Sequence, residues 1–184
     1  MNKGDYGYLK SFKKRRLLFT ILIIAAMAIV IGIGLWLNKG DIKNIYTVIG
    51  ILFALPLART LSGLLVVMPM KMMEKEVQEE LLQKLSHAGS DQFLWDLALS
   101  SQDKVRHFPC LIWSDHHVVA WYEGKDEGSQ TYLTNIMKNN CHRVAVEVYD
   151  KKESFLKAAK KVNFGVTSEE EWERIKETIL IYEM

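Results

Sequence analysis

Residues 17–37, LLFTILIIAAMAIVIGIGLWL, decide the architecture of this chain because they form an apolar run of 21 residues without a charge. As an α-helix the run extends about 31 Å at roughly 1.5 Å per residue, which matches the roughly 30 Å hydrocarbon core of a bilayer. It is longer than the apolar region of an ordinary signal peptide, and no small-x-small cleavage site precedes a plausible mature start. We therefore predict a membrane-spanning helix rather than a cleaved leader.

A second apolar run follows at residues 45–69 and is interrupted mainly by Pro56 and Arg59. This run is also long enough to span a bilayer. Only residues 38–44 connect the two runs, and they include Gly40, which suits a tight turn. We predict an antiparallel transmembrane helical hairpin with both of its ends on the same side of the membrane.

Basic residues near the spans predict the orientation of the hairpin, because Lys and Arg accumulate on the cytoplasmic side. The connecting loop contains only Lys39 and Lys43. A denser basic group precedes the first span and consists of Lys13, Lys14, Arg15 and Arg16. We predict a multi-pass protein of the plasma (inner) membrane with both termini in the cytoplasm, the loop outside, and this basic group against the surface of the lipid bilayer.

The sequence divides into a basic N-terminus at 1–16, the hairpin at 17–70 and a cytoplasmic domain at 71–184. The last part is large enough for one hydrophobic core. It carries 15 Lys and Arg against 20 Asp and Glu, a net charge of −5, so the positive charge of the whole chain belongs to the anchor. An acidic domain lacks the basic surface of a nucleic-acid binder, and we predict no nucleic-acid partner.

The periodicity of the domain predicts a small α/β (α+β) fold with a β-hairpin, at least one further strand and covering helices. Runs rich in β-branched and aromatic residues predict strands at 108–113, 118–123 and 143–149, the first two joined by a tight turn. Amphipathic or capped segments predict helices at 73–85, around 93–99, after Gly128, at 152–162, and from Thr167 or Ser168 to the end.

Arg59 is an ionisable residue within an apolar run, which makes it a candidate functional residue. It lies about 21 Å along the second span, so its side chain can also simply extend to the nearer bilayer surface. Small residues, which let membrane helices approach closely, accompany it on both spans: Ala54, Ala58, Ser62, Ala28 and Gly32. The pattern is consistent with internal packing of the hairpin, pairing of two copies or contact with a membrane-protein partner.

Glu123 and Lys125 form an E-x-K at the end of a predicted strand, and Asp115 lies eight residues earlier. The set resembles the metal-binding core of restriction-endonuclease-like nucleases, which implies a metal-dependent hydrolase with Glu123 and Lys125 as catalytic residues. The predicted β-hairpin opposes this interpretation. Asp115 and Glu123 fall at opposite ends of one strand, about 25 Å apart at roughly 3.3 Å per residue.

Further candidate metal ligands are His116, His117, Cys110, Cys141 and His142. Their spacing contains neither C-x-x-C nor H-E-x-x-H, the patterns of common zinc sites. Cys141 with His116 or His117 is a candidate nucleophile and base for a thiol enzyme. Because these patterns do not converge on one chemistry, we predict no metal and no cofactor.

Four lysines on the predicted helix at 152–162 leave two interpretations open. They are Lys152, Lys157, Lys160 and Lys161. Such residues either form a solvated helix face or contact the anionic inner leaflet, where each contributes about 1 kcal/mol.

These observations favour a membrane-anchored binding or regulatory protein that presents an α/β domain at the inner face of the membrane. Its expected partner is a membrane protein or a second copy of the chain. One alternative is a membrane-anchored enzyme, either a metal-dependent hydrolase or a thiol enzyme. A second alternative is an oligomeric channel or a transporter accessory subunit.

Overall fold

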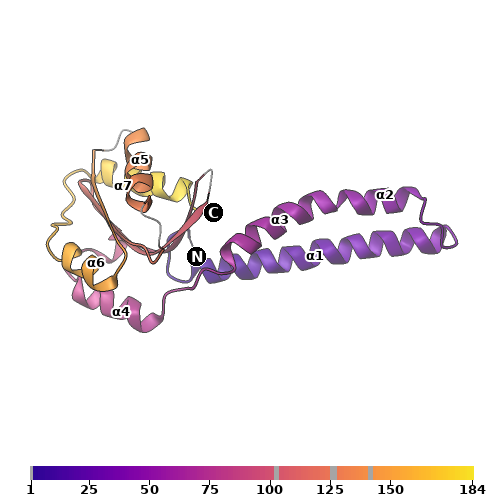
Figure 1. Cartoon of the computed structure of the whole chain (residues 1–184), viewed down its shortest axis with the longest axis horizontal. Coiled ribbons are helices and arrows are strands. Elements are labelled where there is room, and N and C mark those ends of the chain that lie inside the picture. The colour runs from indigo at the N-terminus through magenta and orange to yellow at the C-terminus, as the bar shows by residue number, and fades with distance from the viewer. Residues whose placement is uncertain (1, 102–103, 125–127, 141–142) are drawn as a thin grey trace. The chain divides into compact units, whose positions relative to one another are not determined.

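The computed structural model describes residues 2–101, 104–124, 128–140 and 143–184. They form two compact units. We call the unit of Met1–Leu9 and Lys71–Met184 the domain, and the unit of Lys10–Met70 the apolar hairpin. Figure 1 shows the hairpin as paired helices and the domain as a sheet with helices on both faces.

The hairpin is built from α1 (Tyr8–Leu37), α2 (Ile45–Leu52) and α3 (Ala54–Val67). Tyr8–Leu37 and Ile45–Val67 are each long and apolar enough to cross a membrane by length and composition. This confirms the prediction of two apolar helices. Only 11% of the most apolar window of each is buried, in contrast to the core helix of a soluble protein.

Pro56 explains why the second apolar run forms two helices. It has no N–H to donate to the carbonyl of Leu52, four residues earlier, and its ring crowds that carbonyl. Phe53 instead donates its N–H to the carbonyl of Gly50 at 3.1 Å and separates α2 from α3. The second candidate span, Ile45–Val67, therefore consists of two helices that meet at Phe53.

Two glycines allow the helices of the hairpin to approach each other closely. A Cβ added at Gly34 would lie 2.5 Å from the Cβ of Tyr46. A Cβ added at Gly50 would collide with the side chain of Ile31. Because both positions admit only hydrogen on the facing side, the internal packing of the hairpin depends on these glycines.

The domain contains a mixed four-stranded sheet in the order β1 (Phe93–Ser100), β2 (Val105–Trp113), β3 (His117–Trp121) and β4 (Ala145–Tyr149). The first three strands are antiparallel neighbours, and β3 pairs with β4 in parallel. The predicted β-hairpin and the predicted further strand are confirmed. A parallel pair requires a crossover, which α5 (Ser129–Asn139) provides between β3 and β4.

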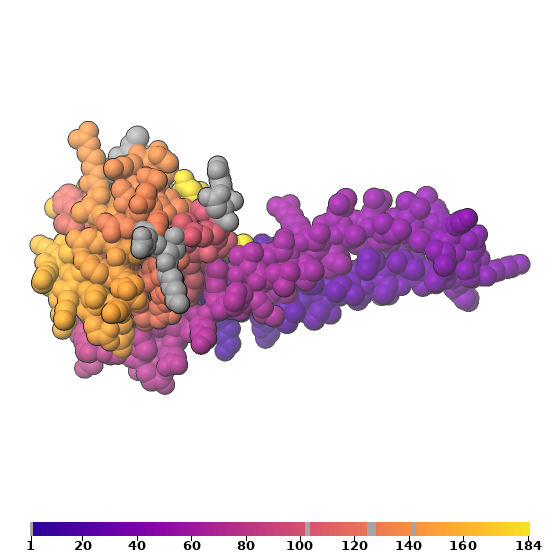
Figure 2. Space-filling model, viewed as in Figure 1, coloured from indigo at the N-terminus to yellow at the C-terminus, as the bar shows by residue number. Residues whose placement is uncertain are grey.

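Helices cover both faces of the sheet (Figure 1). On one face, α5 and α7 (Glu169–Ile181) bury apolar residues against the side chains of Phe108 and Trp113. On the other face, α4 (Lys75–Lys84) and α6 (Lys152–Ala159) pack against Cys110 and Ile112. The yellow-orange atoms of α6 lie at the surface of the domain in Figure 2.

The prediction of a helix around residues 93–99 is wrong, because this segment forms β1. Asp96 has a left-handed backbone with φ of 49°, and it interrupts the alternation of the strand. Leu94 and Leu97, three residues apart, consequently pack on the same face of the sheet, while Trp95 packs on the other. A spacing of three is typical of a helix, and a strand buried on both faces lacks regular polar positions that would contradict it.

Candidate functional site

The segment before the hairpin runs along β1. The N–H of Trp95 donates to the carbonyl of Gly4 at 2.9 Å. The ring of Tyr6 meets the ring of Trp95 edge to face, with 6.5 Å between centroids and 88° between planes. Gly4 has φ of 81° and its Cβ would collide with the side chain of Leu94, so glycine suits both its backbone and its surroundings.

The segment after the hairpin is held by the same part of β1. The buried carboxylate of Asp96 accepts a hydrogen bond from the N–H of Met73 at 2.9 Å. The carbonyl of Met73 accepts one from the hydroxyl of Tyr6 at 3.0 Å. We call Gly4, Tyr6, Met73, Trp95 and Asp96 the junction, because they join the segments that precede Lys10 and follow Met70.

Asp96 is incompletely paired for a buried carboxylate. Its Oδ1 lies 3.5 Å from Nε2 of His107 on β2, whose side chain is 15% exposed. Its Oδ2 is buried and has no hydrogen-bond partner among the described residues, and neither has Nε2 of His107. On the same face of the sheet, burial and then the charge of Asp96 raise the pKa of the Cys110 thiol. Full burial of this kind is typical of a structural cysteine rather than a reactive one.

The C-terminus also reaches the first residues of the chain. Glu183 forms an isolated antiparallel bridge with Leu99 of β1. The ammonium of Lys3 donates to the carbonyls of Leu180, at 3.4 Å, and of Glu183. Burial raises the pKa of the Glu183 carboxyl to about 7, although Lys3 and the N–H of Gly4 act in the opposite direction.

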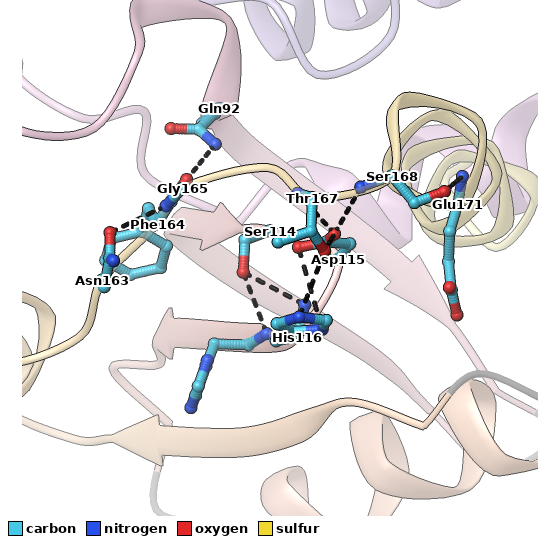
Figure 3. Close-up of polar contacts among 11 residues, drawn as sticks. Gln92, Ser114, Asp115, His116, Asn163, Phe164, Gly165, Thr167, Ser168 and Glu171 are labelled. Carbon is cyan, nitrogen blue, oxygen red and sulfur yellow. Dashed lines mark hydrogen bonds and ion pairs between the residues drawn. The ribbon is translucent and has the colours of Figure 1, made fainter.

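Asp115 has a structural role at the start of α7 (Figure 3). Its Oδ2 accepts hydrogen bonds from the N–H of Thr167 at 2.7 Å, the hydroxyl of Thr167, and the N–H of Ser168 at 2.8 Å. Burial raises the pKa of this carboxyl, but the three hydrogen bonds outweigh burial and hold it below its usual value. The carboxylate is thus committed to the orphan N–H groups that precede a helix.

The side chain of Ser168 completes this cap and confirms one of the two predicted starting residues of the last helix. Its hydroxyl accepts from the N–H of Glu171 at 3.4 Å. In a capping box the N–H of Ser168 would bond the carboxylate of Glu171, yet here it donates to Asp115. The turn between β2 and β3 therefore supplies the acceptor for the N–H of Ser168.

The structure places Glu123 of the predicted E-x-K apart from Asp115. Asp115 precedes β3, whereas Glu123 is exposed and follows the end of this strand at Trp121. Lys125 lies outside the described residues. Asp115 and Glu123 therefore do not lie at the same end of the strand.

The predicted histidine and cysteine ligands are also dispersed. Cys110 is fully buried on β2. The side chain of His116 is 59% exposed, with Nδ1 3.8 Å from Asp115 and Nε2 3.2 Å from the hydroxyl of Thr167. His117 begins β3, and its Nδ1 is buried. Across the part of the chain that the structure describes, no group of three or more His, Cys, Asp or Glu could hold a metal, while Cys141 and His142 lie outside that part.

The predicted small residues of the hairpin lie on its exposed surface. Arg59 is exposed together with its neighbours Ala54, Ala58 and Ser62. Ala28 is exposed as well, and a Cβ added at Gly32 would meet nothing within 4 Å. Within the hairpin, close helix packing is therefore achieved at Gly34 and Gly50, whereas Arg59 and the small residues near it are exposed.

The basic group before the first span divides into two pairs. Lys13 donates from Nζ to the carbonyls of Met68, at 3.3 Å, and of Met70, beyond the end of α3. The guanidinium of Arg16 stacks over the ring of Phe12 at 5.0 Å. The other pair, Lys14 and Arg15, is exposed.

The junction was missed from the sequence, although Asp96 offered a signal. It is the one charged residue in the apolar run FLWDLAL, residues 93–99. Its partners are distant in the chain, with Met73 separated from it by 23 positions, so local periodicity contains no information about the contact.

No family model, curated protein or solved structure matches this chain.

Proposed function

We propose that this protein is a membrane-anchored regulatory protein whose cytoplasmic domain binds a protein or small ligand and transmits its state to the apolar hairpin. The junction is the observation that carries the proposal. Trp95 and Asp96 are consecutive residues of β1, and they hold Gly4 before the hairpin and Met73 after it. A displacement of β1 at this point would therefore move both segments that continue into the hairpin.

Asp96 has the properties of a residue in a switch. A carboxylate excluded from water costs several kcal/mol unless hydrogen bonds and opposite charge compensate it. The left-handed backbone adds about 1–3 kcal/mol of strain. One carboxylate oxygen has no hydrogen-bond partner among the described residues, and the side chain of His107, 3.5 Å from the other oxygen, is 15% exposed. Strain and unpaired polar groups of this kind cluster at functional sites.

The hairpin provides a surface for the partner that such a protein regulates. Arg59 lies on the exposed side of α3 with Ala58 and Ser62. A charge within a membrane span favours a neighbouring acidic or polar group, and small residues beside it let that neighbour approach. We propose a membrane-protein partner or a second copy at this surface.

The first test is the mass and composition of the complex extracted gently from the native membrane. We expect a homo- or hetero-oligomer whose association is weakened about tenfold by Arg59→Leu, a loss of about 1.4 kcal/mol. Lys39→Leu is the matched control, because it removes one positive charge from the loop instead of the span. A monomeric wild-type protein, or equal complexes for Arg59→Leu and the control, would contradict the proposed partner surface.

The role of the junction is tested separately with Asp96→Ala and Asp96→Asn. Asparagine retains an acceptor oxygen and tolerates the left-handed backbone, whereas alanine has neither property. We expect Asp96→Ala to accelerate hydrogen exchange at the Met73 amide and to change the yield of the complex, with Asp96→Asn closer to the wild type. If exchange at Met73 accelerates and the complex is unchanged, the junction is an attachment point and transmits nothing.

A further inference from the structure

A pocket of about 450 Å³ lies between β4 and the end of α6. Glu147 and Tyr149 of β4 form one wall. Ser154, Lys157 and Lys161 form the other. The volume falls in the range of small-molecule sites, which is about 300–1,000 Å³.

The two lysines make the pocket electropositive within an acidic domain. Lys157 lies on α6 and Lys161 follows the end of this helix at Ala159, and both line the pocket. Among the described residues, no carboxylate lies within 4.0 Å of either ammonium group. Like charges that line one pocket repel each other, so the pair contributes no stability that would explain it.

Lys152 of the same helix α6 differs from these two lysines because it is paired within the domain. Lys152 donates to the carboxylate of Glu80 on α4 at 2.9 Å, and Lys84 donates to the same carboxylate at 2.6 Å. These hydrogen bonds, with Lys84 first, lower the pKa of Glu80 to about 2. Lys152 is therefore neutralised within the domain, in contrast to Lys157 and Lys161.

The carboxylate of Glu147 in the pocket wall already has one hydrogen-bond partner, the neighbouring Tyr149. The hydroxyl of Tyr149 donates to Oε2 of Glu147 at 2.7 Å. This hydrogen bond, followed by burial, raises the pKa of Tyr149, so the phenol remains a neutral donor. The other carboxylate oxygen of Glu147, Oε1, can still accept a hydrogen bond in the pocket that the lysines also line.

We propose that this pocket binds a phosphate ester that carries hydroxyl groups. The ammonium groups of Lys157 and Lys161 and the hydroxyl of Ser154 would hold the phosphate, because lysine binds phosphate as a point charge and hydroxyl groups donate to its oxygens. The free oxygen of Glu147 would accept from a hydroxyl of the ligand. The phosphate belongs either to a soluble ester or to the headgroup of an anionic lipid.

This site is independent of the proposed role of the hairpin, because none of its residues belongs to the hairpin or the junction. Failure of either proposal therefore leaves the other intact. The measurement is the rate of lysine acetylation in the full-length protein, followed residue by residue by mass spectrometry. One arm adds sn-glycerol 3-phosphate to the protein in detergent, and the other compares nanodiscs of phosphatidylcholine with nanodiscs that also contain phosphatidylglycerol.

We expect acetylation of Lys157 and Lys161 to slow at least threefold relative to potassium chloride of equal ionic strength, while Lys151 and Lys160 react unchanged. Protection by glycerol phosphate alone identifies a soluble ligand, and protection by phosphatidylglycerol alone identifies a lipid headgroup. Protection in neither arm, or equal protection of all four lysines, overturns the proposal.

Two double variants test the site again, with whichever ligand, glycerol phosphate or phosphatidylglycerol, protects the lysines. Lys157→Gln/Lys161→Gln should weaken binding at least tenfold. Lys151→Gln/Lys160→Gln removes the same charge from exposed positions outside the pocket and should bind as the wild type does. Equal weakening by the two double variants would show a general charge effect and no site.

Discussion

Glu183 is a carboxyl group whose burial opposes its ionisation in the folded domain. Only 5% of the residue is exposed, one carboxylate oxygen has no hydrogen-bond partner among the described residues, and the pKa rises from 4.5 to about 7. Between these values the folded state binds more protons than the unfolded state, so the free energy of unfolding falls as the pH rises. The full loss, reached above about pH 7, is about 3 kcal/mol.

Glu183→Gln should remove most of this pH dependence. We expect the variant to match the wild type near pH 4.5 and to exceed its free energy of unfolding by up to about 3 kcal/mol at pH 8. Urea unfolding in detergent can be followed by tryptophan fluorescence, since four of the five tryptophans lie in the domain: Trp95, Trp113, Trp121 and Trp172. Exposed Glu177 provides the control as Glu177→Gln, and an unchanged pH profile for Glu183→Gln would contradict the burial argument.

At the scale of an element, α7 depends on a carboxylate from another part of the chain. Asp115 accepts from the N–H groups of Thr167 and Ser168, so the β2–β3 turn and the start of the helix are joined. We expect Asp115→Ala to lower the free energy of unfolding by about 2–4 kcal/mol, because it removes a buried carboxylate that accepts three hydrogen bonds at the start of the helix. Chemical unfolding of the full-length protein in detergent measures this change.

A control for the cap lies next to it in the sequence. His116 is mostly exposed, and His116→Ala should change stability by less than about 0.5 kcal/mol. Equal losses for the two variants would show that the turn, and not the carboxylate of Asp115, stabilises the start of α7. Because the pKa of Asp115 is held below its usual value, the carboxylate stays ionised, and the cap persists, down to pH values below the ordinary range of an aspartate.

At the scale of the whole molecule, the prediction concerns the sidedness of the chain. Basic residues gather before the first apolar helix, whereas the loop carries only Lys39 and Lys43. We therefore expect a cysteine at position 42 in the loop to react with a membrane-impermeant maleimide in intact cells. A cysteine at exposed position 86 in the domain should react only after the membrane is opened, in a background of Cys110→Ala and Cys141→Ser. Labelling of position 86 alone in intact cells would reverse the proposed orientation.

The sequence alone determined the apolar hairpin, because the match between a run of apolar residues and the thickness of a bilayer is a local property. It also determined the β2–β3 hairpin and narrowed the start of α7 to Thr167 or Ser168, since both features depend on neighbouring residues. Only the tertiary structure decided that residues 93–100 form a strand and that Asp96 holds Met73. It likewise decided that Asp115, 52 positions before Thr167, accepts hydrogen bonds at the start of α7.

The physical reason is the range over which each interaction acts. Helix periodicity, capping and transfer into lipid are set by residues within a few positions of one another. The conformation of β1 and the partners of its buried carboxylate are set by packing between segments that meet only in the folded domain. The contacts of the junction therefore could not be predicted from local sequence, because they join residues that are far apart in the chain and meet only in the folded domain.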